Sequence, residues 1–270
     1  MEISSTDLIT LKEAYARLEN PSLAIRLSSA VGRPVEAAAK QLAKKVPKAL
    51  MDVVDDSTRK AIEFVMRNTV RTLMGDEPVP ASPRLHKAAA ATTGAVSGFF
   101  GIQSLIIELP VTTGIMFRSI VDIARAEGES PQDNETIINA MQVFTMGSGL
   151  SDKDDAAETS YYGARLALSK AVGDALQYLA THGLRNASAP VLMRFVSAIA
   201  SRFGIVVTQK AMAQALPIVG AVGGGLVNTM FISHFQDMAR GHFAIRRLER
   251  QYGVDAVRES YQLLVVNDAN

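Results

Sequence analysis

The sequence predicts an all-α protein, a multi-helix bundle with two glycine-rich apolar helical segments at its centre. Apolar residues recur at helical spacing along the chain, and no sustained alternation of apolar and polar residues lies between hairpin turns. The two apolar segments cover residues 88–107 and 211–232, and neither contains a charged residue. Each could form about 20 residues of helix, which span about 30 Å. Each could therefore cross a bilayer, insert into a membrane surface or form a buried core helix.

Capping residues and prolines predict the helix starts and stops in the first half of the chain. Thr6 can cap the first helix, and Pro34 suits the first turn of a later one. Ser82-Pro83 combines a cap with a first-turn proline, so a helix begins there and enters the first apolar segment. Pro110 lacks a backbone donor and is expected to bend or break that helix near Glu108. The expected helices cover residues 6–19, 22–31, 34–48, 55–74, 82–108, 111–126 and 130–146.

The second half of the chain is expected to be helical as well. Ser151 can cap a long helix, whose first turn carries aspartates that favour the N-terminal end of the helix dipole. Gly220–Gly225 would weaken an isolated helix, so packing must support the second apolar segment. Gly253 is expected to end the helix that follows this segment. The expected helices cover residues 151–180, 189–202, 203–216, 226–252 and 255–266.

A proline-rich stretch predicts how the chain divides. Residues 75–83 contain three prolines, which indicates a loop and the best linker in the chain. We therefore expect an N-terminal helical arm over residues 1–75, a linker over 76–81 and a main helical domain over 82–270.

Composition disfavours several classes of function. The net charge of +1 argues against general nucleic-acid binding, which needs a basic surface. The chain has no cysteine, which excludes disulfides, thiolate metal sites and cysteine nucleophiles. The first residues include Glu2 and Asp7 and no basic segment, so a cytoplasmic location is the default expectation. Tryptophan is absent and all tyrosines lie outside the two apolar segments, which disfavours an integral membrane protein with aromatic belts.

The residues around the two apolar segments resemble the EcsC family of bacterial proteins. The matching features are Gly98-Phe99-Phe100-Gly101, Glu108-Leu109-Pro110, Ile123-Ala124 before Gly128, the run Leu216–Gly224, and Asn228. The resemblance covers about residues 59–252. It implies a helical protein that can associate with membranes, since the family is named for a protein encoded beside an ABC transporter, and it supplies no catalytic motif. The candidate structural or functional residues are Gly98, Gly101, Glu108, Pro110, Pro217, Gly220, Gly224 and Asn228.

No motif of a catalytic or cofactor site is evident. Ser148 lacks the spacing of a nucleophile elbow, and Gly220–Gly225 lacks the spacing of a dinucleotide-binding turn. His234, Asp237 and His242 are candidate metal ligands, but the two histidines lie about 80° apart around a helix. We expect no metal and no cofactor, and we expect a binding protein more than an enzyme.

Glu108 stands at the edge of an uncharged segment. A carboxylate there must reach water, pair with a cation or be protonated, because an isolated charge is costly in apolar surroundings. Arg118, Arg84 and Lys87 are the candidate partners. The preferred role is structural, in which Glu108 binds backbone amides that Pro110 leaves free.

Two basic clusters could attract an anionic membrane. Lys40, Lys44 and Lys48 repeat every four residues and share one face of the expected helix. Arg240, Arg246, Arg247 and Arg250 follow the second apolar segment. The alternative for the lysines is a solvated outer face, and for the arginines it is pairing with Glu249, Asp255 and other acidic residues.

These observations favour a non-enzymatic protein at the inner face of a membrane. It would bind the membrane surface, anionic lipid or a membrane-linked protein partner through the apolar segments and the basic clusters. Three alternatives stay open: a hydrolase with a pocket near Glu108, a carrier of an apolar ligand between helices, and an integral membrane protein.

Overall fold

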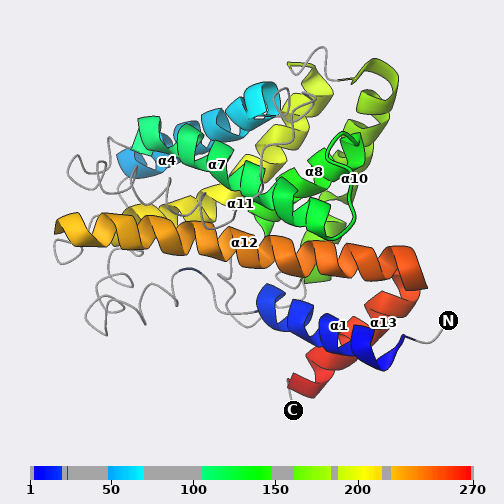
Figure 1. Ribbon diagram of the computed structural model, residues 1–270. Helices are drawn as coiled ribbons and strands as arrows, with labels where there is room; N and C mark the ends of the chain where they lie inside the picture. The colour runs from blue at the N-terminus through cyan, green and yellow to red at the C-terminus, as the bar shows by residue number, and fades with distance from the viewer. Residues whose placement is uncertain are drawn as a thin grey trace.

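The computed structural model describes residues 3–19, 23, 48–69, 105–147, 161–183, 188–214 and 220–268. All regular secondary structure within these ranges is helical (Figure 1), which confirms the predicted all-α bundle. The helices are α1 (Ser5–Leu18), α4 (Lys48–Phe64), α7 (Leu105–Ala126), α8 (Asn134–Gln142), α10 (Tyr161–His182), α11 (Pro190–Gln214), α12 (Gly220–Tyr252) and α13 (Val254–Asp268), with a π-helical turn, η1 (Val65–Thr69), and a 3-10 turn, η3 (Val143–Thr145).

Helix α12 is the central element of the bundle. Its 33 residues reach about 50 Å. It contacts α7, α11 and η3, and it also contacts α1 and α13. Figure 1 shows α7, α8, α10 and α11 above α12, and α1 and α13 below its C-terminal half. Helix α4 packs against α7 and α11, and α10 packs against α8 and α11.

Four phenylalanine rings form the centre of the core. Phe203 of α11 and Phe235 of α12 lie with their ring centroids 5.4 Å apart. Phe144 of η3 lies 5.0 Å from Phe203, and Phe231 lies 5.3 Å from Phe235. All four side chains are fully buried. Tilted and edge-on ring contacts of this kind add to the hydrophobic stabilisation that burial itself provides.

Several helix boundaries differ from the sequence-based expectation. Ser4, and not Thr6, caps α1, because its hydroxyl accepts a hydrogen bond of 3.2 Å from the Asp7 amide. Helix α7 continues through Pro110 without a break. Proline removes the hydrogen bond to the carbonyl four residues earlier and its ring crowds that carbonyl, but the helix continues beside the buried Leu109. Residues 190–214 form one helix where two were expected.

One described helix meets the length and composition of a membrane span. It is the Pro190–Ala211 part of α11, and 50% of its apolar window is buried inside the protein. Its exposed positions include Arg194, Ser197 and Ser201, which are polar. This pattern fits a core helix of the bundle, whose apolar face packs against other helices.

The predicted linker over residues 76–81 lies outside the described residues, so the division into an arm and a main domain stays a prediction. Helix α1 packs against α12 and α13, and α4 packs against α7 and α11. The described helices before the linker thus contact helices that follow it.

We expect Gly241→Ala to destabilise the protein by about 1–3 kcal/mol, since overpacking a close contact has this cost. A Cβ at Gly241 of α12 would lie 2.6 Å from Leu18 Cγ and 3.1 Å from the Ala14 carbonyl oxygen of α1. Urea unfolding measures the change. The matched control is Gly173→Ala in α10, where no atom lies within 4 Å and the helix should gain stability. Equal stability of Gly241→Ala and the wild type would contradict the close approach of α1 to α12.

Candidate functional site

A buried ion pair joins the ends of the two uncharged segments. Glu108 directly follows the first segment, and Lys210 directly precedes the second. Lys210 Nζ donates a hydrogen bond of 2.7 Å to Glu108 Oε1, across 102 residues of sequence. The side chains are 0% and 3% exposed for the lysine and the glutamate. The charged residue after the first segment is therefore the partner of the charged residue before the second.

Lys210 also contacts the second uncharged segment. Its Nζ donates to Asn228 Oδ1 at 2.9 Å and lies 4.8 Å from the centroid of the Phe231 ring. A ring face attracts a cation, so both α12 contacts favour the charged lysine. Burial lowers the pKa of Lys210, while the charge and hydrogen bond of Glu108 oppose this shift. One ammonium group thus connects α7, α11 and α12.

Only one of the two carboxylate oxygens of Glu108 accepts a hydrogen bond within the described residues. Its Oε2 atom is buried and has no hydrogen-bond partner among the residues that the structure describes. A buried acceptor without a donor costs about 1–3 kcal/mol. The pair therefore carries an unfavourable desolvation cost along with its favourable attraction.

Lys210 is a partner that the sequence analysis missed. The three expected partners were Arg118, Arg84 and Lys87. Arg84 and Lys87 lie outside the described residues, and Arg118 lies about 15 Å farther along α7. The preferred contact with backbone amides near Pro110 is replaced by the ion pair, because the long Lys210 side chain reaches Glu108 from α11.

Some of the other candidate residues lie in described helices, and the rest lie outside the described residues. The structure brings Asn228 to Glu108 through Lys210, and Pro110 lies in the same helix as Glu108. Helix α4 begins at Lys48, and the first residues of α12 include Gly220 and Gly224. Outside the described residues are Lys40, Lys44, Gly98, Gly101 and Pro217.

The arginine cluster, Arg240, Arg246, Arg247 and Arg250, pairs with carboxylates of the same chain. Arg246 bridges two acidic residues, 2.9 Å from Glu129 Oε1 and 2.9 Å from Glu135 Oε1. Burial alone would raise the pKa of Glu129, but the hydrogen bond and charge of Arg246 and the charge of Arg250 outweigh it and lower that pKa. Arg240 lies 3.0 Å from Asp237 on its own helix.

Arg247 and Arg250 hold the turn that follows α7. Arg247 Nε donates to Glu127 Oε2 at 2.9 Å, and Arg250 Nη2 donates to the Glu127 carbonyl at 2.6 Å. Arg250 also pairs with Glu129. Gly128 between the two glutamates has φ +84°, the left-handed conformation that commonly ends a helix. Cations beside the last carbonyls of α7 stabilise its C-terminal end.

The acids that the sequence named as partners of the arginine cluster have other partners. Glu249 binds Arg165 at 2.6 Å, and Asp255 binds Arg258 at 2.8 Å. The expected pairing with acidic residues therefore occurs, with Glu127, Glu129 and Glu135 for three of the arginines and Asp237 for Arg240. The role of the cluster in lipid binding stays a prediction.

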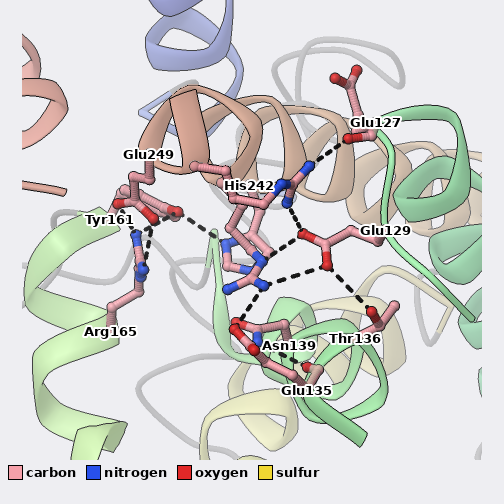
Figure 2. Close-up of polar contacts among 11 residues, drawn as sticks. Glu127, Glu129, Glu135, Thr136, Asn139, Tyr161, Arg165, His242 and Glu249 are labelled. Carbon is pink, nitrogen blue, oxygen red and sulfur yellow. Dashed lines mark hydrogen bonds and ion pairs between the residues drawn. The ribbon is translucent and has the colours of Figure 1, made fainter. Parts of the chain in front are cut away.

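A buried tyrosine–histidine pair connects α10 to α12. Tyr161 Oη lies 2.9 Å from His242 Nδ1, and Arg165 donates to the same hydroxyl at 3.1 Å (Figure 2). Burial, reinforced by the charges of Arg165 and Arg246, places the pKa of His242 well below its usual value. The hydroxyl accepts from Arg165, and the direction of its hydrogen bond with Nδ1 depends on the tautomer of the neutral histidine.

The candidate residues for metal binding or hydrolysis have contacts other than Glu108. His242 lies 14 residues after Asn228, which is about 21 Å along α12. His234 packs against Gly147, where an added Cβ would lie 2.5 Å from His234 Cε1. Within the described ranges, no three histidine or acidic side chains are grouped so that they could hold a metal ion.

We expect Lys210→Met to lower the unfolding free energy by about 3–5 kcal/mol, because it leaves the buried Glu108 charge without a cation. The double variant Glu108→Met/Lys210→Met removes both charges and should recover most of this loss. Urea unfolding of the wild type, both single variants and the double variant gives the coupling energy. Additive losses in the double variant would contradict a direct ion pair.

We expect His242 to make stability depend on pH. The folded-state pKa lies below the unfolded value of about 6.5, so the unfolded chain takes up a proton that the folded chain does not. The stability conferred by neutral His242 is fully present above about pH 6.5. It falls below that pH, by at most about 1.4 kcal/mol per pH unit.

The measurement for His242 is the unfolding free energy between neutral and mildly acidic pH. His242→Gln should reduce the pH slope, and His182→Gln, at an exposed position of α10, should retain it. An unchanged slope in His242→Gln would exclude the histidine as its source.

The comparisons with known proteins agree with the resemblance seen in the sequence. The model of the EcsC protein family matches residues 18–248, a range that includes both uncharged segments together with Glu108, Lys210 and Asn228. No curated protein and no solved structure matches the chain. On the strength of this match, the chain belongs to the EcsC protein family.

Proposed function

We propose that this chain is a non-enzymatic protein that associates with a membrane surface through its uncharged segments, residues 88–107 and 211–232. The observation that carries the proposal is the Glu108–Lys210 contact, which joins the residue after the first segment to the residue before the second. Both segments are thereby attached to the bundle at one place. Val227, Phe231 and Ile232 of the second segment are buried in the core, so the proposal assigns lipid contact to other parts of the two segments.

Both uncharged segments are connected to helices of the described bundle. The uncharged segments continue into the described helices: the first ends in α7, and the second contains the end of α11 and the start of α12. Binding at a membrane surface scales with the apolar area that enters the boundary of the acyl chains. The glycines of the segments allow close helix contacts, either with each other or among lipid chains.

Apolar insertion is proposed as the main contribution to binding, with electrostatic attraction as a second one. To bind lipid phosphate, the arginine cluster would have to leave Glu127, Glu129 and Glu135. Lys40, Lys44 and Lys48 are the basic residues that the proposal assigns to anionic headgroups. The inner face of the membrane, which carries such lipids, is the proposed location.

We expect the purified protein to co-sediment with phosphatidylcholine vesicles and more strongly with vesicles that contain phosphatidylglycerol. High salt should weaken the second interaction and leave the first, because apolar insertion is not screened. Phe99→Asp places a charge in the first segment and should lower the vesicle-bound fraction by about tenfold or more.

The control variant is Leu166→Asp, at a position of α10 that is 75% exposed and outside both segments. It should bind as the wild type does. Wild-type protein that stays in the supernatant with every vesicle composition would rule out the proposed function.

A further inference from the structure

We propose that α4 and α7 bind small hydroxyl-bearing molecules between them, at five buried oxygen atoms that have no hydrogen-bond partner in the described part of the chain. The two helices pack against each other and lie side by side in Figure 1. The five atoms, which together we call the hydroxyl site, are Ser57 Oγ and Thr58 Oγ1 of α4 and Glu108 Oε2, Thr112 Oγ1 and Thr113 Oγ1 of α7. This inference goes beyond the proposed membrane association and does not depend on it.

The four side-chain hydroxyls of the site differ from other threonine hydroxyls in the described helices. Helical threonines commonly donate to a backbone carbonyl of their own helix. Thr208 and Thr229 do so, each with a bond of 2.8 Å to the carbonyl four residues earlier. The hydroxyls of the site make no such bond, although their residues are fully buried. Each of them can therefore bond to another molecule.

The oxygens of the site lie on neighbouring turns of the two helices. Glu108 and Thr112 are four residues apart in α7, so their side chains are neighbours on one face of the helix. Two residues before the α4 hydroxyls, Asp55 lies beside α11, since a Cβ at Gly204 would be 3.7 Å from Asp55 Oδ1. Lys210, which binds Glu108, follows Gly204 by six residues, or about 9 Å along α11. Both parts of the site are thus positioned against the same stretch of α11.

The charges at the site favour a neutral ligand that carries hydroxyl groups. The Glu108 carboxylate can only accept hydrogen bonds, so its Oε2 atom needs a donor. Lys210 Nζ lies 2.7 Å from the other carboxylate oxygen and balances its charge. A second cation would be repelled by this ammonium group, which disfavours a metal ion or an amine. A hydroxyl group can donate to the carboxylate and also accept from a serine or threonine hydroxyl.

Water and small polyols such as glycerol share this chemistry. Buried water molecules typically make about three hydrogen bonds to polar groups that otherwise have no partner. One bound hydroxyl group can therefore join several oxygens of the site. Burial without such partners would destabilise the contact between α4 and α7, because each polar atom loses its hydration on folding.

The first experiment compares the unfolding equilibrium constants of the wild type, Thr112→Val and Thr113→Val by urea titration in polyol-free buffer. Valine keeps the branched shape of threonine and removes the hydroxyl. A hydroxyl that bonds to a bound molecule stabilises the fold, so each variant should have an unfolding constant about threefold to tenfold larger. A buried hydroxyl without a partner opposes folding, so variants as stable as the wild type, or more stable, would overturn the proposal.

Glycerol distinguishes the two sources of the hydroxyl group. The control is Thr208→Val, which removes a hydroxyl that bonds within its own helix and lies outside the site. It reports the general rise of the thermal midpoint that excluded osmolytes cause. If glycerol occupies the site, the wild type and the control gain a further rise that Thr112→Val and Thr113→Val lack. If water occupies it, all four proteins shift equally and the two valine variants keep their larger unfolding constants.

A high-resolution crystal structure of the wild type tests the site without any substitution. We expect density for water or glycerol within hydrogen-bond distance of Glu108 Oε2 and Thr112 Oγ1. Side chains of α4 and α7 that fill this region, with no bound molecule there, would overturn the proposal even if the valine variants lose stability. None of these measurements uses vesicles, so a failure of membrane association leaves the hydroxyl site standing.

Discussion

The ion pair between Glu108 and Lys210 is the constraint on which the arrangement of the central helices depends. Removing two charges from water costs several kcal/mol for each ion, and only a close partner offsets this cost. The partner must therefore lie within hydrogen-bond distance when the helices have packed, and the 2.7 Å contact meets this condition. The pair is compatible with few alternative registers of α11 against α7 and α12. It thus contributes specificity to a region where glycine and small apolar residues would otherwise allow sliding.

The C-terminal half of α12 is fixed by a different set of contacts. Tyr252 donates to Asp7 of α1 at 2.7 Å, and Tyr261 of α13 donates to Glu19 at 2.7 Å. The turn after α7 is held by the arginine cluster, and α10 is held by the Tyr161–His242 contact. Tyrosine suits such positions, because its ring packs in the core while its hydroxyl reaches a polar partner. This half of the bundle joins helices from both ends of the chain, and its carboxylates are satisfied by several donors.

The fold class and most helices follow from the sequence, since periodicity, caps and glycines are local signals. The need of Glu108 for a cation also follows from its place beside an uncharged segment. The identity of that cation does not, because Lys210 is 102 residues away and the expected partners were neighbours in sequence. A signal was present: Lys210 is the last charge before the second uncharged segment. The pairing of the arginines with Glu127 and Glu129 depends on the packing of α7 against α12, which no local signal in the sequence predicts.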